Sequence, residues 1–175
     1  MATTVDADGT SLNANERRMA ATLAQLLAES RLPGEAELAG AELDEVAAFL
    51  LEAARSRAEG AASILIRSGQ GNRRVTRVAV INRDMPFLVD SIAAAVAAHG
   101  LDIDMLVHPV LPVLRNANRQ LADLPQDGTG TRESFIYIET DRIDARQRRA
   151  LEDAIKVKVI DRTAVILDIF FTLHD

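Results

Sequence analysis

The residues with the clearest potential for chemistry lie in one short segment, Asn82-Arg-Asp-Met-Pro-Phe-Leu88. An alternating, β-branched apolar run precedes it, and apolar residues return at helical spacing after Pro86, which predicts a strand, a tight acidic turn and a helix. The first N–H groups of a helix lack intrahelical partners and carry a partial positive charge, so they can bind an anion. Asp84 adds a carboxylate, which can cap the helix or bind an ammonium group.

An amino acid has one carboxylate and one ammonium group, and this turn would offer a partner for each. The candidate ligand-binding residues are therefore Asn82, Arg83, Asp84, Met85, Phe87 and Leu88. Helix capping by Asp84 would explain the same residue without any ligand. The sequence leaves both interpretations open.

The remaining patterns indicate no metal, nucleotide or nucleophilic site. Gly69-Gln-Gly71 begins like a dinucleotide loop, but Arg74 stands where the third glycine belongs, and a strand rather than a helix follows. His99, His108 and His174 are far apart and there is no cysteine, so no spacing suits a metal. We expect no cofactor in this chain and no catalysis by this chain alone.

The charge balance bears on the class of partner. The net charge of −6 argues against a nucleic-acid partner, which usually needs a basic face. Arg73, Arg74 and Arg77 are interpreted as a solvated strand entrance, with phosphate binding as the alternative. The N-terminus lacks the layout of a signal peptide, and no apolar run is long enough to span a bilayer. We therefore expect a cytoplasmic protein with no membrane partner.

Hydrophobic periodicity divides the chain into residues 1–12, 13–72 and 73–175. The first part is small and polar and predicts a disordered tail. The second part predicts one helix from Asn15 to Pro33, a second at about Glu42–Arg57 and a short strand at Ile64–Ile66, so that an N-terminal helical hairpin precedes the main module.

The third part predicts the order β-α-β-β-α-β, the split βαβ or ferredoxin-like pattern of an α+β fold. Its predicted elements are the strand Val75–Ile81, the helix Pro86–His99, the strands Ile103–Leu114 and Glu133–Thr140, a helix from Asp144 to about Lys156, and the strand-like runs Val157–Ile160 and Val165–Leu173. Pro109 and Pro112 place the second of these strands at an edge or a bulge, because proline cannot donate to a ladder. Gly100 is expected to end the first helix, and Asp144 with Gln147 to form a capping box.

Apolar residues shared between these elements predict the core of the third part. Val78, Val80, Ile136 and Ile138 should be buried on central strands. Leu88, Ile92 and Val96 should pack over them from the first helix.

Several of these segments together resemble a known family. They are Arg83-Asp-Met-Pro-Phe-Leu-Val-Asp-Ser-Ile92, His99-Gly-Leu101, Val107-His-Pro-Val-Leu111, Glu133-Ser-Phe135 and Glu139-Thr-Asp-Arg142. From about Leu38 to Leu151 the chain resembles the N-terminal region of the large bacterial NAD-dependent, or NAD-specific, glutamate dehydrogenases. That region is similar to an ACT domain, a βαββαβ module that usually binds amino acids at subunit interfaces.

The resemblance implies a regulatory or assembly role without catalysis, an amino-acid effector and a homodimer. It implies NAD and the oxidoreductase reaction, oxidative deamination of glutamate to 2-oxoglutarate, only for the full-length family, because its dehydrogenase domain has no counterpart here. The run Val165–Leu173 is a candidate for a tail-mediated dimer contact. Amino-acid-binding ACT modules commonly have glycine after the proline of the turn, whereas this chain has Phe87. The alternative is a free-standing ACT-like ligand-binding or dimerisation module without dehydrogenase activity.

Overall fold

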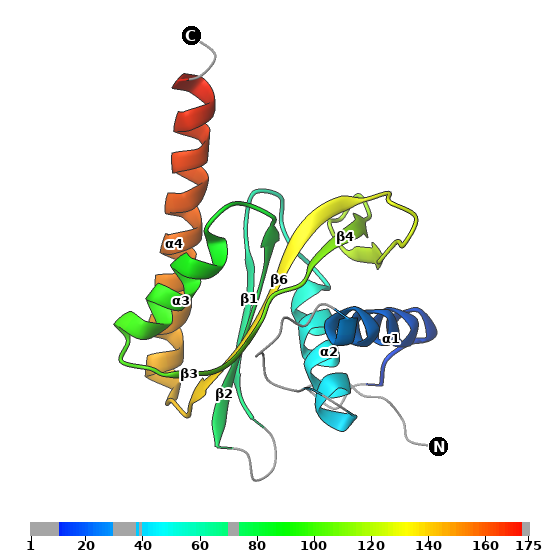
Figure 1. The fold of residues 1–175 in the computed structure, drawn as a ribbon, viewed down its shortest axis with the longest axis horizontal. Helices are drawn as coiled ribbons and strands as arrows, with labels where there is room; N and C mark the ends of the chain where they lie inside the picture. The colour runs from blue at the N-terminus through cyan, green and yellow to red at the C-terminus, as the bar shows by residue number, and fades with distance from the viewer. Residues whose placement is uncertain (1–10, 30–37, 39, 70–73, 173–175) are drawn as a thin grey trace.

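The structure, a computed structural model, describes residues 11–29, 38, 40–69 and 74–172, with side chains as far as Thr163. Residues 1–10 of the expected tail, residues 70–73 and His174 lie outside the described residues. The described part is an antiparallel six-stranded sheet with helices on both faces (Figure 1). This confirms the α+β class that the sequence predicts.

The described residues form four helices and six strands. They are α1 (Ala14–Glu29), α2 (Ala41–Ala54), β1 (Ser63–Ser68), β2 (Val75–Arg83), α3 (Leu88–Ala98), β3 (Ile103–Val107), β4 (Val110–Arg115), β5 (Leu121–Asp123), β6 (Thr131–Asp141) and α4 (Ala145–Thr172). The strand order is β1-β2-β6-β4-β5, and β3 also pairs with β6.

The centre of the sheet is the pair β2 and β6, which is buried on both faces. Side chains of a strand alternate between its faces, so neighbouring residues enter different cores. On β6, Phe135 and Tyr137 pack with α1 and α2. Ile136 and Ile138 pack with α3 and α4. The second core also contains Val78, Val80, Leu88, Ile92 and Val96, which confirms the predicted core.

The first helices cover one face of the sheet. In α1 the buried residues Met19, Leu23 and Leu27 recur at intervals of four, the spacing of one helical face. In α2 the six residues from Val46 to Leu51 are all buried, because α2 lies between α1 and the sheet (Figure 1). The short strand predicted at Ile64–Ile66 is confirmed as β1, which pairs along its whole length with β2.

The strand predicted at Ile103–Leu114 is divided in two. β3 ends at Val107 and β4 begins at Val110, so the break falls on His108 and Pro109. Proline has no N–H to donate, which interrupts the ladder at this point. The pairing of β3 with β6 also shifts register between Ile103 and Met105. The expected edge or bulged character of this segment is therefore confirmed.

The ends of two helices follow the predicted chemistry. Gly100 has a φ of 71°, the left-handed conformation expected after α3. Its N–H donates to the carbonyl of Ala97 at 2.9 Å. At the start of α4, the Gln147 N–H donates to Asp144 Oδ1 at 2.8 Å and Gln147 Oε1 accepts from the Asp144 N–H at 3.0 Å. The capping box is confirmed.

The C-terminal part differs from the prediction. Val157–Ile160 and the described part of Val165–Leu173 are helical, because α4 continues as one helix of 28 residues to Thr172. Short β-branched apolar runs cannot be assigned to strand or helix by periodicity alone. The sheet needs no strand from this region, since β1 already lies beside β2. The predicted final strand is therefore wrong. The exact order β-α-β-β-α-β is not confirmed, because three strands, β3, β4 and β5, lie between α3 and β6 where the prediction has one.

The helix α4 measures about 42 Å at 1.5 Å per residue, and its last turns extend beyond the sheet (Figure 1). Over the described residues, no helix combines the length and the apolar character needed to cross a bilayer.

Truncation of a central core residue tests this architecture. Ile138 is fully buried on β6, so Ile138→Ala should lower the free energy of unfolding by about 2–5 kcal/mol in urea titrations, because it leaves a cavity under α3 and α4. Leu114→Ala is the control, since Leu114 is 39% exposed on β4. A loss for Ile138→Ala no larger than that of the control would contradict the burial of β6.

Candidate functional site

The predicted turn connects β2 to α3, and its residues lie in different environments. Asn82 is buried at the end of β2 and donates from Nδ2 to the Arg83 carbonyl at 3.3 Å. Leu88 is buried in the core under α3, and Met85 packs partly against the same core. Arg83 and Asp84 are exposed, and Phe87 is 65% exposed. The strand, turn and helix predicted here are confirmed.

Asp84 does not cap the helix, contrary to one of the two interpretations left open by the sequence. The helix begins at Leu88 rather than Pro86, and its N-cap residue is Phe87, which provides no side-chain hydrogen bond. Asp84 Oδ1 instead accepts from the Ser134 hydroxyl at 3.0 Å, and the Asp84 N–H donates to the Arg132 carbonyl at 3.2 Å. The Asp84 carboxylate is thus bound to β6, four residues before the first residue of the helix.

The backbone at Phe87 is left-handed, with a φ of 62°. Glycine adopts this conformation readily, whereas for a residue with a Cβ the conformation costs free energy. At the position where the resemblance to ACT modules leads us to expect glycine, the backbone is therefore glycine-like but the side chain is phenylalanine. The ring points outward, and the Arg162 guanidinium of α4 lies 5.7 Å from its centroid.

Ser134 brings together three segments that are distant in sequence. In the sheet it pairs with Asn82 of β2 on one side and with Val110 of β4 on the other. His108, just before β4, is close enough to Asp84 to be influenced by its charge. Neither His108 nor Ser134 is among the site residues predicted from the sequence, although both lie in the segments that carry the family resemblance.

The imidazole of His108 lies in an unusual environment. Burial lowers the pKa of His108 below its ordinary value, and the negative charge of Asp84 offsets only part of this effect. Its Nε2 atom is buried and has no hydrogen-bond partner among the described residues. At neutral pH this ring is therefore uncharged, beside the carboxylate of Asp84.

A second polar cluster is fully buried on the opposite face of the sheet, and the sequence gives no sign of it. Glu133 accepts from Arg115 Nη2 at 2.9 Å and from Arg57 Nη2 at 3.0 Å. Arg115 also donates to the Ala54 carbonyl at the end of α2. Burial by itself would raise the pKa of Glu133, but the hydrogen bonds from both arginines outweigh it and leave the pKa below its ordinary value.

Arg77 belongs to a third buried group rather than to a phosphate site. Its Nε donates to the Tyr137 hydroxyl at 3.0 Å, and its guanidinium lies 4.4 Å from the centroid of the Phe49 ring. The Tyr137 hydroxyl donates to Glu139 Oε1 at 2.7 Å. Because Arg77 is 7% exposed, its interpretation as part of a solvated entrance is wrong.

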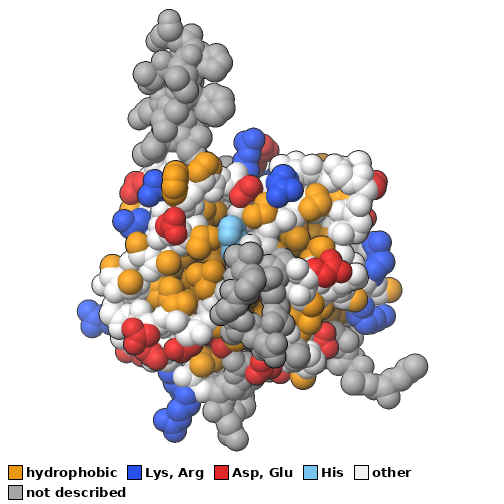
Figure 2. Space-filling view, in the orientation of Figure 1, with side chains coloured by type: hydrophobic (Ala, Val, Ile, Leu, Met, Phe, Trp, Pro, Cys, Tyr) orange, Lys and Arg blue, Asp and Glu red, His pale blue; other side chains and the backbone are white. Residues whose placement is uncertain are grey.

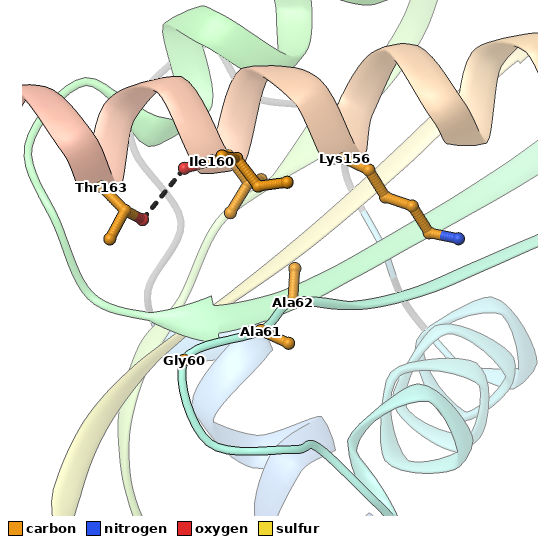
Figure 3. Close-up of a pocket in the computed structure, with 7 residues that line it drawn as sticks. Gly60, Ala61, Ala62, Lys156, Ile160 and Thr163 are labelled. Atoms are coloured by element: carbon orange, nitrogen blue, oxygen red, sulfur yellow. Dashed lines mark hydrogen bonds between the residues drawn. The ribbon is translucent and has the colours of Figure 1, made fainter.

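The described part of α4 is flanked by hollows on two sides. An apolar groove of about 460 Å³ runs between α4 and the segment Gly60–Ala62 (Figure 3), with Val159 and Ile160 among its lining residues. A polar cleft of about 400 Å³ lies between α3 and α4, and Ser91 accepts there from Arg162 Nε at 2.6 Å. In the part of the chain that the structure describes, no group of acidic and histidine side chains could hold a metal ion.

Comparison with known proteins gives a consistent result. The profile of a family described as "Glutamate dehydrogenase, ACT1 domain" matches residues 23–155. The NAD-specific glutamate dehydrogenase of Pseudomonas aeruginosa is 41% identical over 85 residues, which make up 46% of this chain and 5% of that protein. The NAD-specific glutamate dehydrogenase of Halomonas elongata is 37% identical over 71 residues, 38% of this chain and 4% of that protein.

The chain thus spans only a small part of the length of these relatives. No solved structure matches it.

The buried ion cluster predicts a large loss of stability from a substitution that removes a single charge. Glu133→Gln should lower the free energy of unfolding by about 3–5 kcal/mol, because it leaves the buried cations of Arg57 and Arg115 without a counter-charge. Glu152→Gln is the control, since Glu152 forms an exposed pair with Lys156 that is worth at most about 1 kcal/mol. Equal losses of unfolding free energy for Glu133→Gln and Glu152→Gln in urea titrations would contradict the buried ion cluster.

The same carboxylate predicts a dependence on pH. A pKa that is lower in the folded than in the unfolded protein stabilises the fold above the unfolded value, here near 4.5, and this stability is lost as the pH falls through the folded value. The wild type should therefore lose stability below about pH 4.5, and Glu133→Gln should lose less over that range. Parallel curves for the two proteins would contradict this assignment.

Because the backbone at Phe87 is left-handed, we expect glycine to be more stable than alanine at this position, the reverse of the order within a helix. Phe87→Ala and Phe87→Gly both remove the ring, but only alanine keeps the Cβ that strains this backbone. The glycine variant should be the more stable by about 1 kcal/mol in urea titrations. Ala94, exposed within α3, is the control site, where glycine should cost about 1 kcal/mol relative to alanine. If glycine and alanine variants had the same order of stability at positions 87 and 94, this would contradict the backbone strain at Phe87.

Proposed function

The chain belongs to the glutamate dehydrogenase ACT1 domain family, and we propose that it acts as a non-catalytic regulatory and assembly region of a large NAD-specific glutamate dehydrogenase. The family match carries this proposal, because it includes the whole β2–turn–α3 unit and most of both cores. The dehydrogenase reaction itself, and the NAD that it needs, would belong to other parts of such an enzyme. The sheet would be a variant of the ferredoxin-like module in which β1 takes the place of the last strand.

The regulatory part of the proposal is that the turn Asn82–Leu88 binds an amino-acid effector. The start of α3 would hold the carboxylate of the amino acid, since Phe87 gives the first helical N–H groups no side-chain cap. Asp84 would hold the ammonium group. One Asp84 oxygen accepts from Ser134, and a carboxylate has further lone pairs for a second partner.

Two features of the site support an effector rather than a purely structural turn. The backbone at Phe87 retains a conformation that costs energy, and such strain tends to occur at functional sites. The neutral His108 and the hydroxyl of Ser134 lie near the same carboxylate, so the end of the sheet offers polar groups beyond the turn. The assembly part of the proposal is a homodimer.

A thermal-shift screen against the twenty amino acids tests the effector site. A ligand that binds only the native state stabilises it by about 2.7 kcal/mol at a concentration of 100 times its Kd. For a chain of this size that corresponds to a rise in Tm of roughly 5–10 °C.

Asp84→Asn should abolish or strongly reduce the shift, because asparagine can still accept from Ser134 but has no negative charge. Asp104→Asn is the control, since Asp104 is exposed on β3 away from the turn, and its shift should equal that of the wild type. Equal shifts in Asp84→Asn and the wild type would rule out the ammonium role of Asp84. A wild type that no amino acid stabilises at millimolar concentration would rule out the effector site.

A further inference from the structure

The outer side of α4 carries large apolar side chains that the fold does not cover. The inner side is buried through Leu151, Ile155 and Val159, which recur at intervals of four. At about 100° per residue, Val157 and Ile160 fall on the side of the helix away from this core. They are 55% and 66% exposed, and are two of the four large hydrophobic side chains exposed among the described residues.

Two opposite charges flank this apolar pair. Lys156 precedes Val157 and Asp161 follows Ile160, and both charged residues are exposed. We call these four residues, Lys156, Val157, Ile160 and Asp161, the outer stripe. Lys156 also forms an exposed pair with Glu152 at 3.2 Å, which is weak enough to be exchanged for another partner.

The outer stripe is complementary to itself in the antiparallel direction. Consider two copies of α4 that run antiparallel and are related by a two-fold axis passing between Lys158 and Val159. Each residue then faces the partner residue that lies equally far from the axis on its other side. Val157 then faces the partner's Ile160, and Lys156 faces the partner's Asp161. An isologous dimer requires this property, in which one patch complements its own rotated copy.

We propose that a second copy of this chain packs antiparallel along α4, with the outer stripe as the centre of the interface. The charge pattern selects this occupant, because the apolar pair meets an apolar pair and each cation meets an anion only in this arrangement of two copies. The sheet of each copy packs against the opposite side of its own helix, through Leu151, Ile155 and Val159. This inference rests on the assembly role proposed above and names its surface.

The groove beside α4 is consistent with this interface. Ile160 belongs both to the outer stripe and to the groove wall that faces Gly60–Ala62 (Figure 3), so the partner's side chains have apolar space beside the helix. On the side of the molecule that carries α3 and α4, hydrophobic side chains lie exposed between charged ones (Figure 2). Such a mixed surface suits an interface with an apolar centre and a polar rim.

Sedimentation velocity on the full chain tests the surface. The wild type should be a dimer at micromolar concentrations, and Ile160→Asp should raise the dimer Kd at least tenfold, because it places a charge in the apolar centre. Leu114→Asp is the control, since Leu114 is also an exposed hydrophobic residue but lies on β4, and its dimer Kd should stay near the wild-type value. Circular dichroism checks that each variant keeps its fold, as expected for exposed positions.

Charge reversal tests the antiparallel direction. Lys156→Asp faces the partner's Asp161 with a like charge, and Asp161→Lys faces the partner's Lys156 likewise, so each variant alone should dimerise roughly tenfold more weakly. Mixed in equal amounts, the two variants should form a heterodimer with wild-type affinity, because both charge pairs are then restored. A mixture as weak as its components would overturn the antiparallel arrangement.

The outcomes separate this inference from the proposed function. A dimer that persists in Ile160→Asp overturns the α4 surface and leaves an assembly role through another surface. A wild type that is monomeric at high micromolar concentration overturns both the surface and the assembly role. Neither result affects the effector site, which the rise in Tm with amino acids tests independently.

Discussion

The antiparallel pairing of β2 with β6 extends from Val75 opposite Asp141 to Arg83 opposite Glu133, and most of it is covered by helices on both faces. A shift of one residue in this pairing would exchange the two faces of a strand. It would move Phe135 and Tyr137 into the core under α3 and α4, and Ile136 and Ile138 into the core under α1 and α2. The same register sets Ser134 beside Asn82 and next to Val110. The position of the candidate turn therefore follows from the hydrophobic pattern of the two central strands.

Charged groups on the α1 and α2 face have a different role from the apolar core around them. Desolvation offsets much of the attraction in a buried ion pair, so the cluster of Glu133, Arg57 and Arg115 adds little net stability relative to an apolar core. Its hydrogen bonds are directional, however, and Arg115 reaches both Glu133 on β6 and the Ala54 carbonyl of α2. Arg77 joins β2 to the Glu45 carbonyl of α2 in the same way. These contacts give α2 one defined position on the sheet.

Both proposed roles, effector binding and assembly, fall on the same face of the sheet. The face under α1 and α2 is closed by buried ion and hydrogen-bond clusters. On the other face, Phe87 at the start of α3 contacts Arg162 of α4, and the outer stripe begins two turns earlier on the same helix. Arg162 also donates to Ser91 of α3. A ligand at the turn and a second copy along α4 would therefore act on neighbouring parts of one helical layer, which is how an effector could influence assembly.

The sequence by itself determined the features that depend on local chemistry. These include the periodicity of the central strands and of α1, the strand–turn–helix at Asn82–Leu88, the left-handed Gly100, the capping box of Asp144 and Gln147, and the edge or bulged character of the segment that contains Pro109 and Pro112. The tertiary structure decided the features that depend on competition between distant partners. Asp84 has the residue type of a helix cap, but Ser134 on another strand binds it instead. Val157–Ile160 has the residue types of a strand, but the edge beside β2 is occupied by β1, so the run remains helical. Glu133 alternates along β6 like its neighbours, and only the folded sheet brings Arg57 and Arg115 to its carboxylate. A local sequence pattern indicates which partners a side chain is able to bind. Which of these partners it does bind depends on the free energy of the whole folded chain.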